Sequence, residues 1–218
     1  GKAKQSARKQ NAFKTKHLNL WVGARESWLN LEDWKRWADP ELSIEQFIGE
    51  ECTKGVDLSE SDDLTADVSC FTKEIAGKTH YYFFPRTYVT EKKAEEIDIY
   101  RDWIDQDALI MCEGSSIDYD EVENAIEHDN EEHFVTGLFY DPAGAAPIAQ
   151  RVHNKTAIEP IKVAQNYTNF SPAMREFGNL LGQGRIHHTG CPVLTWCLGN
   201  VIAKETMDGK YIRPVKEH

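Results

Sequence analysis

The stretch that decides the fold of this chain is Phe134-Val135-Thr136-Gly137-Leu138-Phe139-Tyr140-Asp141-Pro142. Its first seven residues carry no charge and are mostly apolar, which predicts a buried strand over 134–140. Asp141-Pro142 ends that strand, because proline has no N–H to donate to a neighbouring strand. A helix is expected directly afterwards, from about 143 to 153. A buried strand that runs into a helix is typical of an α/β domain.

The sequence pattern before this strand predicts a meander of strands followed by alternating helices and strands. The elements expected there are strands at 53–58, 64–74, 79–88 and 108–112 and helices at 91–106 and 118–128, the last capped by Asp118. Polar residues at 59–63 and the sequence Ala76-Gly77-Lys78 separate the first three strands. Together with the strand at 134–140 they predict one mixed central sheet that begins with strand 53–58, flanked by the strands at 64–74 and 79–88.

The two ends of the chain add shorter elements. We expect a helix from near Leu31 with Asn30 as its cap, a short helix at 43–49, a short strand at 161–165, helices at 172–182 and 192–199, and a hairpin formed by 200–206 and 210–215. The hairpin is predicted because Asp208-Gly209 is a strong turn signal between two strand-like runs.

Composition narrows the class of protein. The chain has 218 residues, 25 Lys and Arg, 36 Asp and Glu, and a net charge of −11. These values exclude collagen-like and low-complexity chains, and no apolar run has the length of a membrane span. No signal peptide is recognisable. Residues 1–17 hold six Lys and Arg and no acid, which suggests either a nucleic-acid-binding arm or a solvated linker.

Several common kinds of site receive little support. The five cysteines are scattered without a C-x-x-C pair, which favours buried free thiols over a zinc or redox motif. His187-His188, followed by Cys191, lacks zinc-ligand spacing. The acidic residues of 120–133 do not follow the EF-hand pattern and are interpreted as a solvated face. No P-loop or dinucleotide-binding motif is present.

Asp57 and Asp141 are the carboxylates that the strand pattern singles out, since each lies at the end of an apolar strand. If those strands are neighbours in one sheet, the two carboxylates converge. Their mutual repulsion would then be relieved by Mg²⁺ or Mn²⁺, which prefer such oxygen ligands. Two ions about 3.5–4 Å apart can clamp a phosphodiester. The alternative is that each aspartate only caps a turn.

Several segments in order resemble the nuclease domain of the large terminase subunit of tailed bacteriophages. The matching segments are Leu18-Asn19-x-Trp21, Gly55-Val56-Asp57-Leu58-Ser59 with Asp63-Leu64-Thr65-Ala66, Gly114 with Asp118-Tyr119, Tyr140-Asp141-Pro142, Gln165 with Ser171-Pro172-Ala173, and His188-x-Gly190-x-Pro192-Val193-Leu194-x-Trp196 with Asn200-Val201. The resemblance covers nearly the whole chain. It departs from the family at Cys112-Glu113, where Thr-Pro is usual, and at Ala143, where an aromatic is usual.

The resemblance implies a ribonuclease H-like fold, with a mixed central sheet flanked by helices and a C-terminal β-hairpin. It implies a DNA endonuclease that cuts concatemeric double-stranded viral DNA with two Mg²⁺ or Mn²⁺ ions, held by Asp57 and Asp141. The carbonyl of Leu58 is a further candidate oxygen. Asp63 either supports the site or caps the turn after the first strand, and His188 either contacts the DNA backbone or holds a loop.

DNA contacts are expected to favour phosphates, because packaging cuts many sequences. The candidates, besides His188, are Arg185, Lys204, Lys210, Arg213 and Lys216.

By the same resemblance, residues 1–40 form a basic interdomain arm with a Trp-rich helical lead-in, and 41–218 form the nuclease domain. No ATPase is expected in this part of the protein. The family's third acidic ligand follows a Pro-x-Lys stretch. Here Pro214-Val215-Lys216 is followed by only two residues, so the catalytic C-terminal helix is expected to be missing.

Further implied partners are double-stranded DNA, the N-terminal ATPase domain, the portal and the small terminase subunit, without a membrane. The implied location is the host cell cytoplasm, transiently at the procapsid portal and not in the mature virion. Two alternatives stay open: another ribonuclease H-like nuclease or transposase-like enzyme, and a non-catalytic DNA-packaging assembly module.

Overall fold

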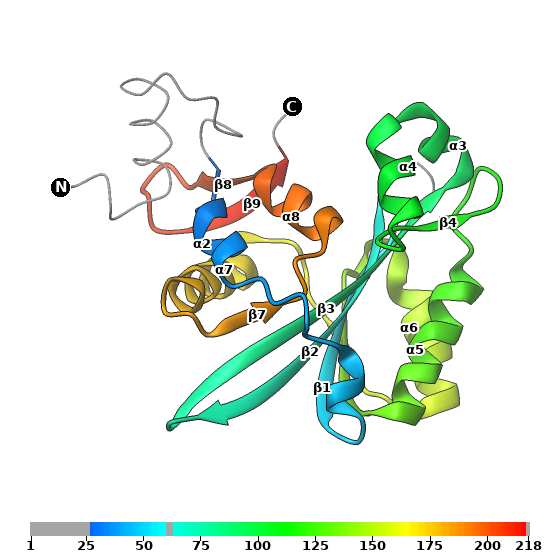
Figure 1. Ribbon diagram of the computed structural model, residues 1–218, viewed down its shortest axis with the longest axis horizontal. Helices are drawn as coiled ribbons and strands as arrows, with labels where there is room; N and C mark the ends of the chain where they lie inside the picture. The colour runs from blue at the N-terminus through cyan, green and yellow to red at the C-terminus, as the bar shows by residue number, and fades with distance from the viewer. Residues whose placement is uncertain (1–26, 60–62, 217–218) are drawn as a thin grey trace. The chain divides into compact units, whose positions relative to one another are not determined.

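The computed structural model describes residues 27–59 and 63–216 (Figure 1). The chain separates into two compact units, each built from more than one segment. Among the described residues, one unit combines 39–164 with 187–193, and the other combines 27–38, 165–186 and 194–216. We call the first the sheet unit and the second the hairpin unit. The predicted arm at 1–17 lies outside the described residues.

The sheet unit is built on a mixed sheet whose strands are β1 (Glu51–Asp57), β2 (Thr65–Ile75), β3 (Lys78–Thr90), β4 (Ile110–Cys112), β5 (Phe134–Tyr140) and β6 (Pro160–Lys162). Their order across the sheet is β4-β3-β2-β1-β5-β6, and the short strand β7 (Ile186–His188) also pairs with β3. β1 is antiparallel to β2 and parallel to β5. The expected mixed sheet is confirmed, but β1 lies between β2 and β5 and not, as expected, between the strands at 64–74 and 79–88.

Local sequence signals account for the meander. Ile75 pairs with Lys78, so Ala76 and Gly77 form a two-residue hairpin loop. Both have positive φ, 51° and 73°, which is the conformation that matches the twist of the flanking strands. In β1, buried residues alternate with more exposed ones, so one face of the strand enters the core.

The helices of the sheet unit are α3 (Glu91–Glu96), α4 (Asp98–Asp105), α5 (Tyr119–Glu132) and α6 (Pro142–Thr156), and the short 3₁₀ helix η2 (Ile44–Phe47) precedes β1. Helices α5 and α6 cover one face of the sheet (Figure 1). Val122 and Ile126 of α5 and Ile148 and Val152 of α6 join the same buried core as Leu138 of β5. The predicted strand-to-helix passage after residue 140 is confirmed.

The helix expected at 91–106 is two helices, broken at Ile97, whose backbone is extended (φ −128°, ψ 103°). Ala94 of α3 and Trp103 of α4 are both buried. In one straight helix these positions would be about 180° apart, so a continuous helix could not bury both. The break resolves this conflict.

The hairpin unit contains α2 (Leu31–Arg36), α7 (Tyr167–Gly182), α8 (Pro192–Gly199, whose first two residues belong to the sheet unit), β8 (Val201–Glu205) and β9 (Ile212–Lys216). β8 and β9 form the expected antiparallel hairpin, with Asp208-Gly209 in its loop. Asn30 caps α2 as predicted, because its side chain accepts the Glu32 N–H. No described helix has the length and apolarity to cross a lipid bilayer.

Candidate active site

Asp57 and Asp141 lie side by side at one edge of the sheet. The parallel register of β1 and β5 places Val56 beside Tyr140, and Asp57 and Asp141 are the next residues. Neighbouring strands are about 4.8 Å apart. Val56 and Tyr140 are buried, and side chains alternate along a strand, so both aspartates turn to the opposite face. The condition set by the sequence, that the two strands be neighbours, is met.

The backbone after Asp141 is shaped to hold its carboxylate. Asp141 is the N-cap of α6, and its Oδ1 accepts a hydrogen bond of 3.1 Å from the Ala143 N–H. Gly144 has a φ of +103°, which side chains with a Cβ rarely adopt, and regular helix begins only after it. Capping and metal binding are compatible, because an ionised carboxylate has about four lone-pair sites.

The turn after Asp57 is closed by Ser59 and Thr65. The Ser59 N–H donates to Thr65 Oγ1 at 2.9 Å, and the Thr65 hydroxyl donates to the Ser59 carbonyl at 3.2 Å. The backbone N–H of Asp63 donates to Ser59 Oγ at 3.1 Å, so Asp63 takes part in this turn. Thr65 is fully buried, which anchors the turn and holds Asp57 at the strand end.

A buried ion cluster lies on the face of the sheet that α5 and α6 cover. The sequence pattern did not predict it. It consists of Lys54, Asp67, Arg86 and Asp129. Lys54 Nζ, 1 % exposed, contacts Asp67 Oδ1 at 3.0 Å, Ser69 Oγ at 2.9 Å and the Asp129 carboxylate. Arg86 bonds Asp67 at 2.9 Å and Asp129 at 2.9 and 3.1 Å. The cluster ties β1, β2, β3 and α5 together.

The four charges balance, yet the two carboxylates titrate differently. Complete burial raises the pKa of Asp67, and the charges of Lys54 and Arg86 counter only part of that effect. Burial also acts to raise the pKa of Asp129, but hydrogen bonds from Arg86 and the charge of Lys54 outweigh it and leave the pKa below its ordinary value. The signal in the sequence that could have located the cluster is Lys54, which occupies an inward-facing position of a strand, because a buried lysine needs charged partners.

The interpretation of the acidic residues of 120–133 as a solvated face is wrong for Glu123 and Asp129. Asp129 is buried in the ion cluster and Glu123 is 2 % exposed. Glu123 pairs with Arg151 at 2.6 Å and Lys155 at 2.7 Å, which joins α5 to α6. The helix therefore buries two of its acids against cations from other elements, and such partners are invisible in a local charge pattern.

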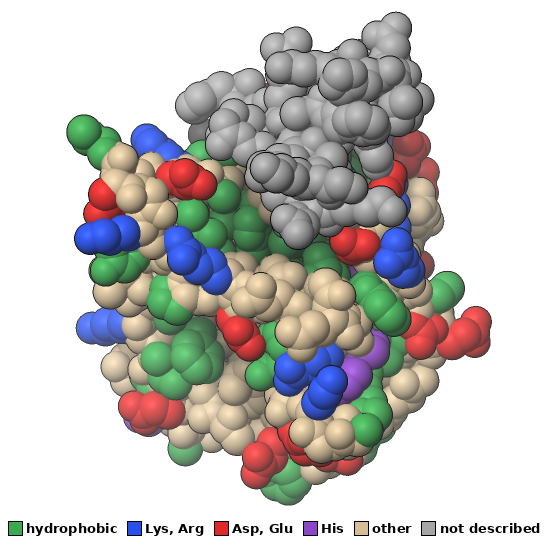
Figure 2. Space-filling model, turned by 90° about the vertical axis from the view of Figure 1, so that its left-hand side faces the viewer, with side chains coloured by type: hydrophobic (Ala, Val, Ile, Leu, Met, Phe, Trp, Pro, Cys, Tyr) green, Lys and Arg blue, Asp and Glu red, His purple; other side chains and the backbone are tan. Residues whose placement is uncertain are grey.

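The basic residues proposed to contact DNA belong mostly to the hairpin unit. Lys204 of β8 lies directly opposite Arg213 of β9. The Arg213 guanidinium is 5.3 Å from the Tyr167 ring, and Lys210 lies 3.7 Å from Asp208 in the hairpin loop. Arg185 donates to Gln183 at 3.2 Å. Lys216 ends β9 opposite Val201. On the face in Figure 2, Lys and Arg are interspersed with Asp and Glu.

His188 differs from these residues because it is buried, with 1 % of its surface exposed. Its Nδ1 accepts a hydrogen bond of 3.1 Å from the Gly190 N–H, and its carbonyl accepts one of 2.9 Å from the Asp39 N–H. Of the two roles considered for His188, these contacts match the holding of a loop, and its burial leaves little surface for a phosphate.

The cysteine and histidine side chains are spread over the described part of the chain. In the described part of the chain, no group of three or more His, Cys, Asp and Glu side chains could hold a metal ion. Cys52 and Cys112 are buried, and the other three cysteines are half-buried. Burial raises the pKa of Cys52 to about 11 and that of Cys70 to about 12, so both remain thiols.

Comparison with known proteins agrees with this architecture. The family model for the terminase large subunit, endonuclease domain, matches residues 1–218. Protein YmfN of Escherichia coli K12 is 35% identical over 228 residues, which cover 99% of this chain and 50% of YmfN. The terminase large subunit of Enterobacteria phage HK97 is 22% identical over 92% of this chain and 40% of that protein. The chain thus spans about half the length of these relatives.

Solved structures share the fold. The HK97 large terminase superposes with a TM-score of 0.73 at 22% identity, over 98% of this chain and 44% of that one. The large terminase nuclease of thermophilic phage G20c gives 0.55 at 10% identity, over 88% and 91%. Its magnesium-bound form gives 0.50 at 10% identity, over 89% and 91%. With a mixed sheet of this order and a family model spanning its length, the chain belongs to the family of terminase large subunit endonuclease domains and has their ribonuclease H-like fold.

Proposed function

We propose that this chain is a divalent-metal-dependent endodeoxyribonuclease that cuts concatemeric double-stranded viral DNA during genome packaging. The observation that carries the proposal is the adjacency of Asp57 and Asp141 at the ends of two parallel strands. Two carboxylates in this position repel each other unless cations lie between them. This donor set fits Mg²⁺ or Mn²⁺, which bind carboxylate oxygens. A magnesium-bound structure of the G20c nuclease supports the same choice of metal.

Asp57 and Asp141 would hold two ions, with the Leu58 carbonyl as a further oxygen. When bound, such ions lower the pKa of water and stabilise the leaving oxygen of a phosphodiester. The protein's own contribution is positional. The Ser59–Thr65 turn holds Asp57, and the cap of α6 orients Asp141, so the carboxylates are preorganised before DNA arrives. The products would carry 5′-phosphate and 3′-hydroxyl ends.

The protein context proposed for this activity follows the family. Double-stranded DNA is the substrate, and Arg185, Lys204, Lys210, Arg213 and Lys216 are the candidates for phosphate contacts. An ATPase domain in the same polypeptide, the portal and the small terminase subunit would be partners. Action would take place in the host cytoplasm, transiently at the procapsid portal, and the protein would not remain in the mature virion.

The decisive experiment is cleavage of supercoiled plasmid with Mn²⁺. Wild-type protein should cut and should stop when a chelator is added, whereas Asp57→Asn and Asp141→Asn should each lower cutting to background. Asparagine is also a good N-cap, so Asp141→Asn keeps the start of α6. Without metal, both variants should melt at or above the wild-type temperature, because the repulsion is relieved.

The matched control is Asp105→Asn, at an exposed position of α4, which should cut like the wild type. Near wild-type cutting by either site variant would refute the assignment. DNA binding without metal-dependent cutting by the wild type would favour an assembly module instead.

A further inference from the structure

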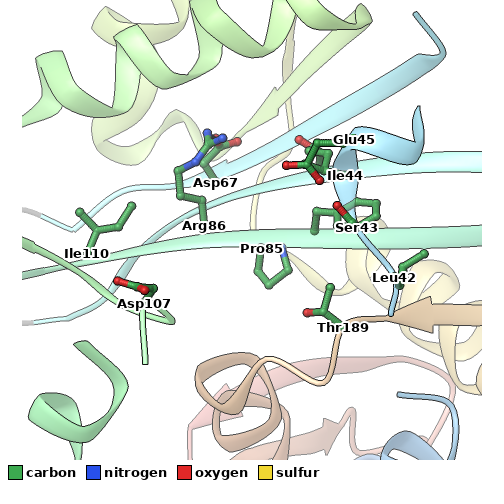
Figure 3. Close-up of a pocket in the computed structure, with 12 residues that line it drawn as sticks. Leu42, Ser43, Ile44, Glu45, Asp67, Pro85, Arg86, Asp107, Ile110 and Thr189 are labelled. Carbon is green, nitrogen blue, oxygen red and sulfur yellow. Dashed lines mark hydrogen bonds and ion pairs between the residues drawn. The ribbon is translucent and has the colours of Figure 1, made fainter. Parts of the chain in front are cut away.

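A pocket of about 410 Å³ opens on the same face of the sheet as the ion cluster (Figure 3). Its volume falls within the range of small-ligand pockets. Asp67 is paired in register with Arg86 and Val56, whereas Asp57 is paired with Ala66. Directly paired residues share a face and successive ones alternate. The pocket and the aspartate pair therefore lie on opposite faces of the sheet.

The charges of the lining residues determine which kind of ligand group the pocket can bind. Its charged lining residues are Glu45, Asp67, Asp107 and Arg86. Arg86 and Asp67 already belong to the balanced ion cluster, so Glu45 and Asp107 carry the remaining charge. No Lys or Arg of the described residues forms an ion pair with either of them. The pocket thus presents two uncompensated carboxylates, which repel phosphate and attract a cation.

The pocket walls suit the stem of a long side chain. Leu42, Ile44, Phe84, Pro85 and Ile110 provide apolar surface. Pro85 lies on β3 before the segment Tyr88–Thr90 that pairs with β4. Asp67 also lines the pocket, but its Oδ1 forms a 3.0 Å ion pair with Lys54 Nζ, so this carboxylate is already compensated from within the protein.

We propose that this pocket receives an arginine side chain of a partner polypeptide. Glu45 and Asp107 come from opposite sides of the pocket (Figure 3). A guanidinium has five donors in a planar fork and can bond two carboxylates, whereas an ammonium is a compact point charge. Its methylene stem would pack against Pro85 and Phe84. The site is thus a protein-docking pocket, separate from the face that carries Asp57 and Asp141.

The test is a titration followed by amide NMR shifts, with N-acetyl-arginine amide as the probe and the neutral isostere N-acetyl-citrulline amide as its control. The arginine probe should give saturable shifts centred on Ser43, Glu45 and Thr189, and citrulline should give none. Glu45→Gln combined with Asp107→Asn should weaken the arginine response at least tenfold. Asparagine suits position 107, whose φ is +55°.

Glu41→Gln is the matched control, since Glu41 is exposed on the same segment but does not line the pocket; it should bind the probe like the wild type. Plasmid cutting by the double variant should also equal the wild type, which separates this proposal from the nuclease assignment. Equal responses to citrulline and arginine, an unchanged response in the double variant, or saturable shifts at these amides with inorganic phosphate would each overturn it.

Discussion

At the scale of single residues, the feature with the largest consequence is a lysine in the core. Lysine is almost never fully buried unless paired, and Lys54 meets this condition through Asp67 and Asp129. It stands on the inward face of β1 between Cys52 and Val56, both buried. Because its partners come from β2 and α5, Lys54 links β1, the strand that ends in Asp57, to these two elements.

Lys54→Met should lower the free energy of unfolding by about 3–5 kcal/mol, because removal of one partner leaves buried charge uncompensated. Urea denaturation at pH 7 measures the loss. Lys78→Met, at the exposed β2–β3 turn, should change stability by less than about 0.5 kcal/mol. Similar values for the two variants would mean that the ion cluster contributes little to stability.

His187 should make stability depend on pH. Its Nε2 lies 2.8 Å from His80 Nδ1, and its ring stacks on Tyr82 with centroids 4.5 Å apart. Burial, together with His80, lowers the pKa of His187, and Asp39 offsets this only in part. The unfolded chain therefore binds the proton more readily, so stability should be complete above about pH 6.5 and should fall as the pH drops through that value.

Denaturation at pH 7.5 and 5.5 tests this. His187→Gln should show a smaller loss between the two pH values than the wild type. His128→Gln, whose side chain is 68% exposed, should keep the wild-type difference. If His187→Gln also keeps it, His187 is not the source of the dependence.

At the scale of elements, α7 shows how a cap changes a helix boundary. Pro172 favoured a helix start at that residue, since proline is common in the first turn. The helix instead begins at Tyr167, because the Asn166 side chain caps it by accepting the Asn169 N–H at 2.9 Å. Proline then lies inside the helix and leaves one carbonyl of the preceding turn without its usual donor.

Two glycines near the end of α7 should respond oppositely to alanine. Gly184 has a φ of +70°, and a Cβ there would lie 2.5 Å from the Trp37 ring. Gly184→Ala should therefore lower the free energy of unfolding by about 2 kcal/mol or more. Gly178→Ala, inside the helix with its nearest neighbour at 3.9 Å, should raise it by up to about 1 kcal/mol.

Thermal melts of the two variants check the pair. A melting temperature for Gly184→Ala at or above that of Gly178→Ala would contradict the described approach of Trp37 to the helix end.

At the scale of the whole molecule, the net negative charge of the chain opposes the binding of DNA. The chain carries −11 overall, yet the hairpin of β8 and β9 presents Lys204, Lys210 and Arg213. Bound cations at the aspartate pair would change the local field from repulsive to attractive for phosphate. DNA affinity should therefore depend on both the hairpin cations and divalent metal.

Duplex affinity should fall steeply with salt and differ little between unrelated sequences, because the binding of phosphates by cationic side chains releases counterions. Lys204→Gln with Lys210→Gln should flatten the slope of log K against log salt by about 1 for each of the two lysines that binds a phosphate. Lys78→Gln, in the other unit, should keep the slope. Fluorescence anisotropy over several salt concentrations measures it, and an unchanged slope in the double variant would exclude the hairpin as the phosphate-binding surface.

The sequence by itself determined most of the order of strands and helices and the strand ends at Asp57 and Asp141, because alternation, proline and glycine act over a few residues. The ribonuclease H-like class was implied by the resemblance of its ordered motifs to the terminase nuclease family. Only the tertiary structure decided that β1 lies beside β5, that Lys54, Glu123 and Asp129 are buried, that 91–105 is broken at Ile97, and that β7 exists. These features depend on partners distant in the chain, and a three-residue strand such as β7 forms only because β3 offers it an edge with which to pair.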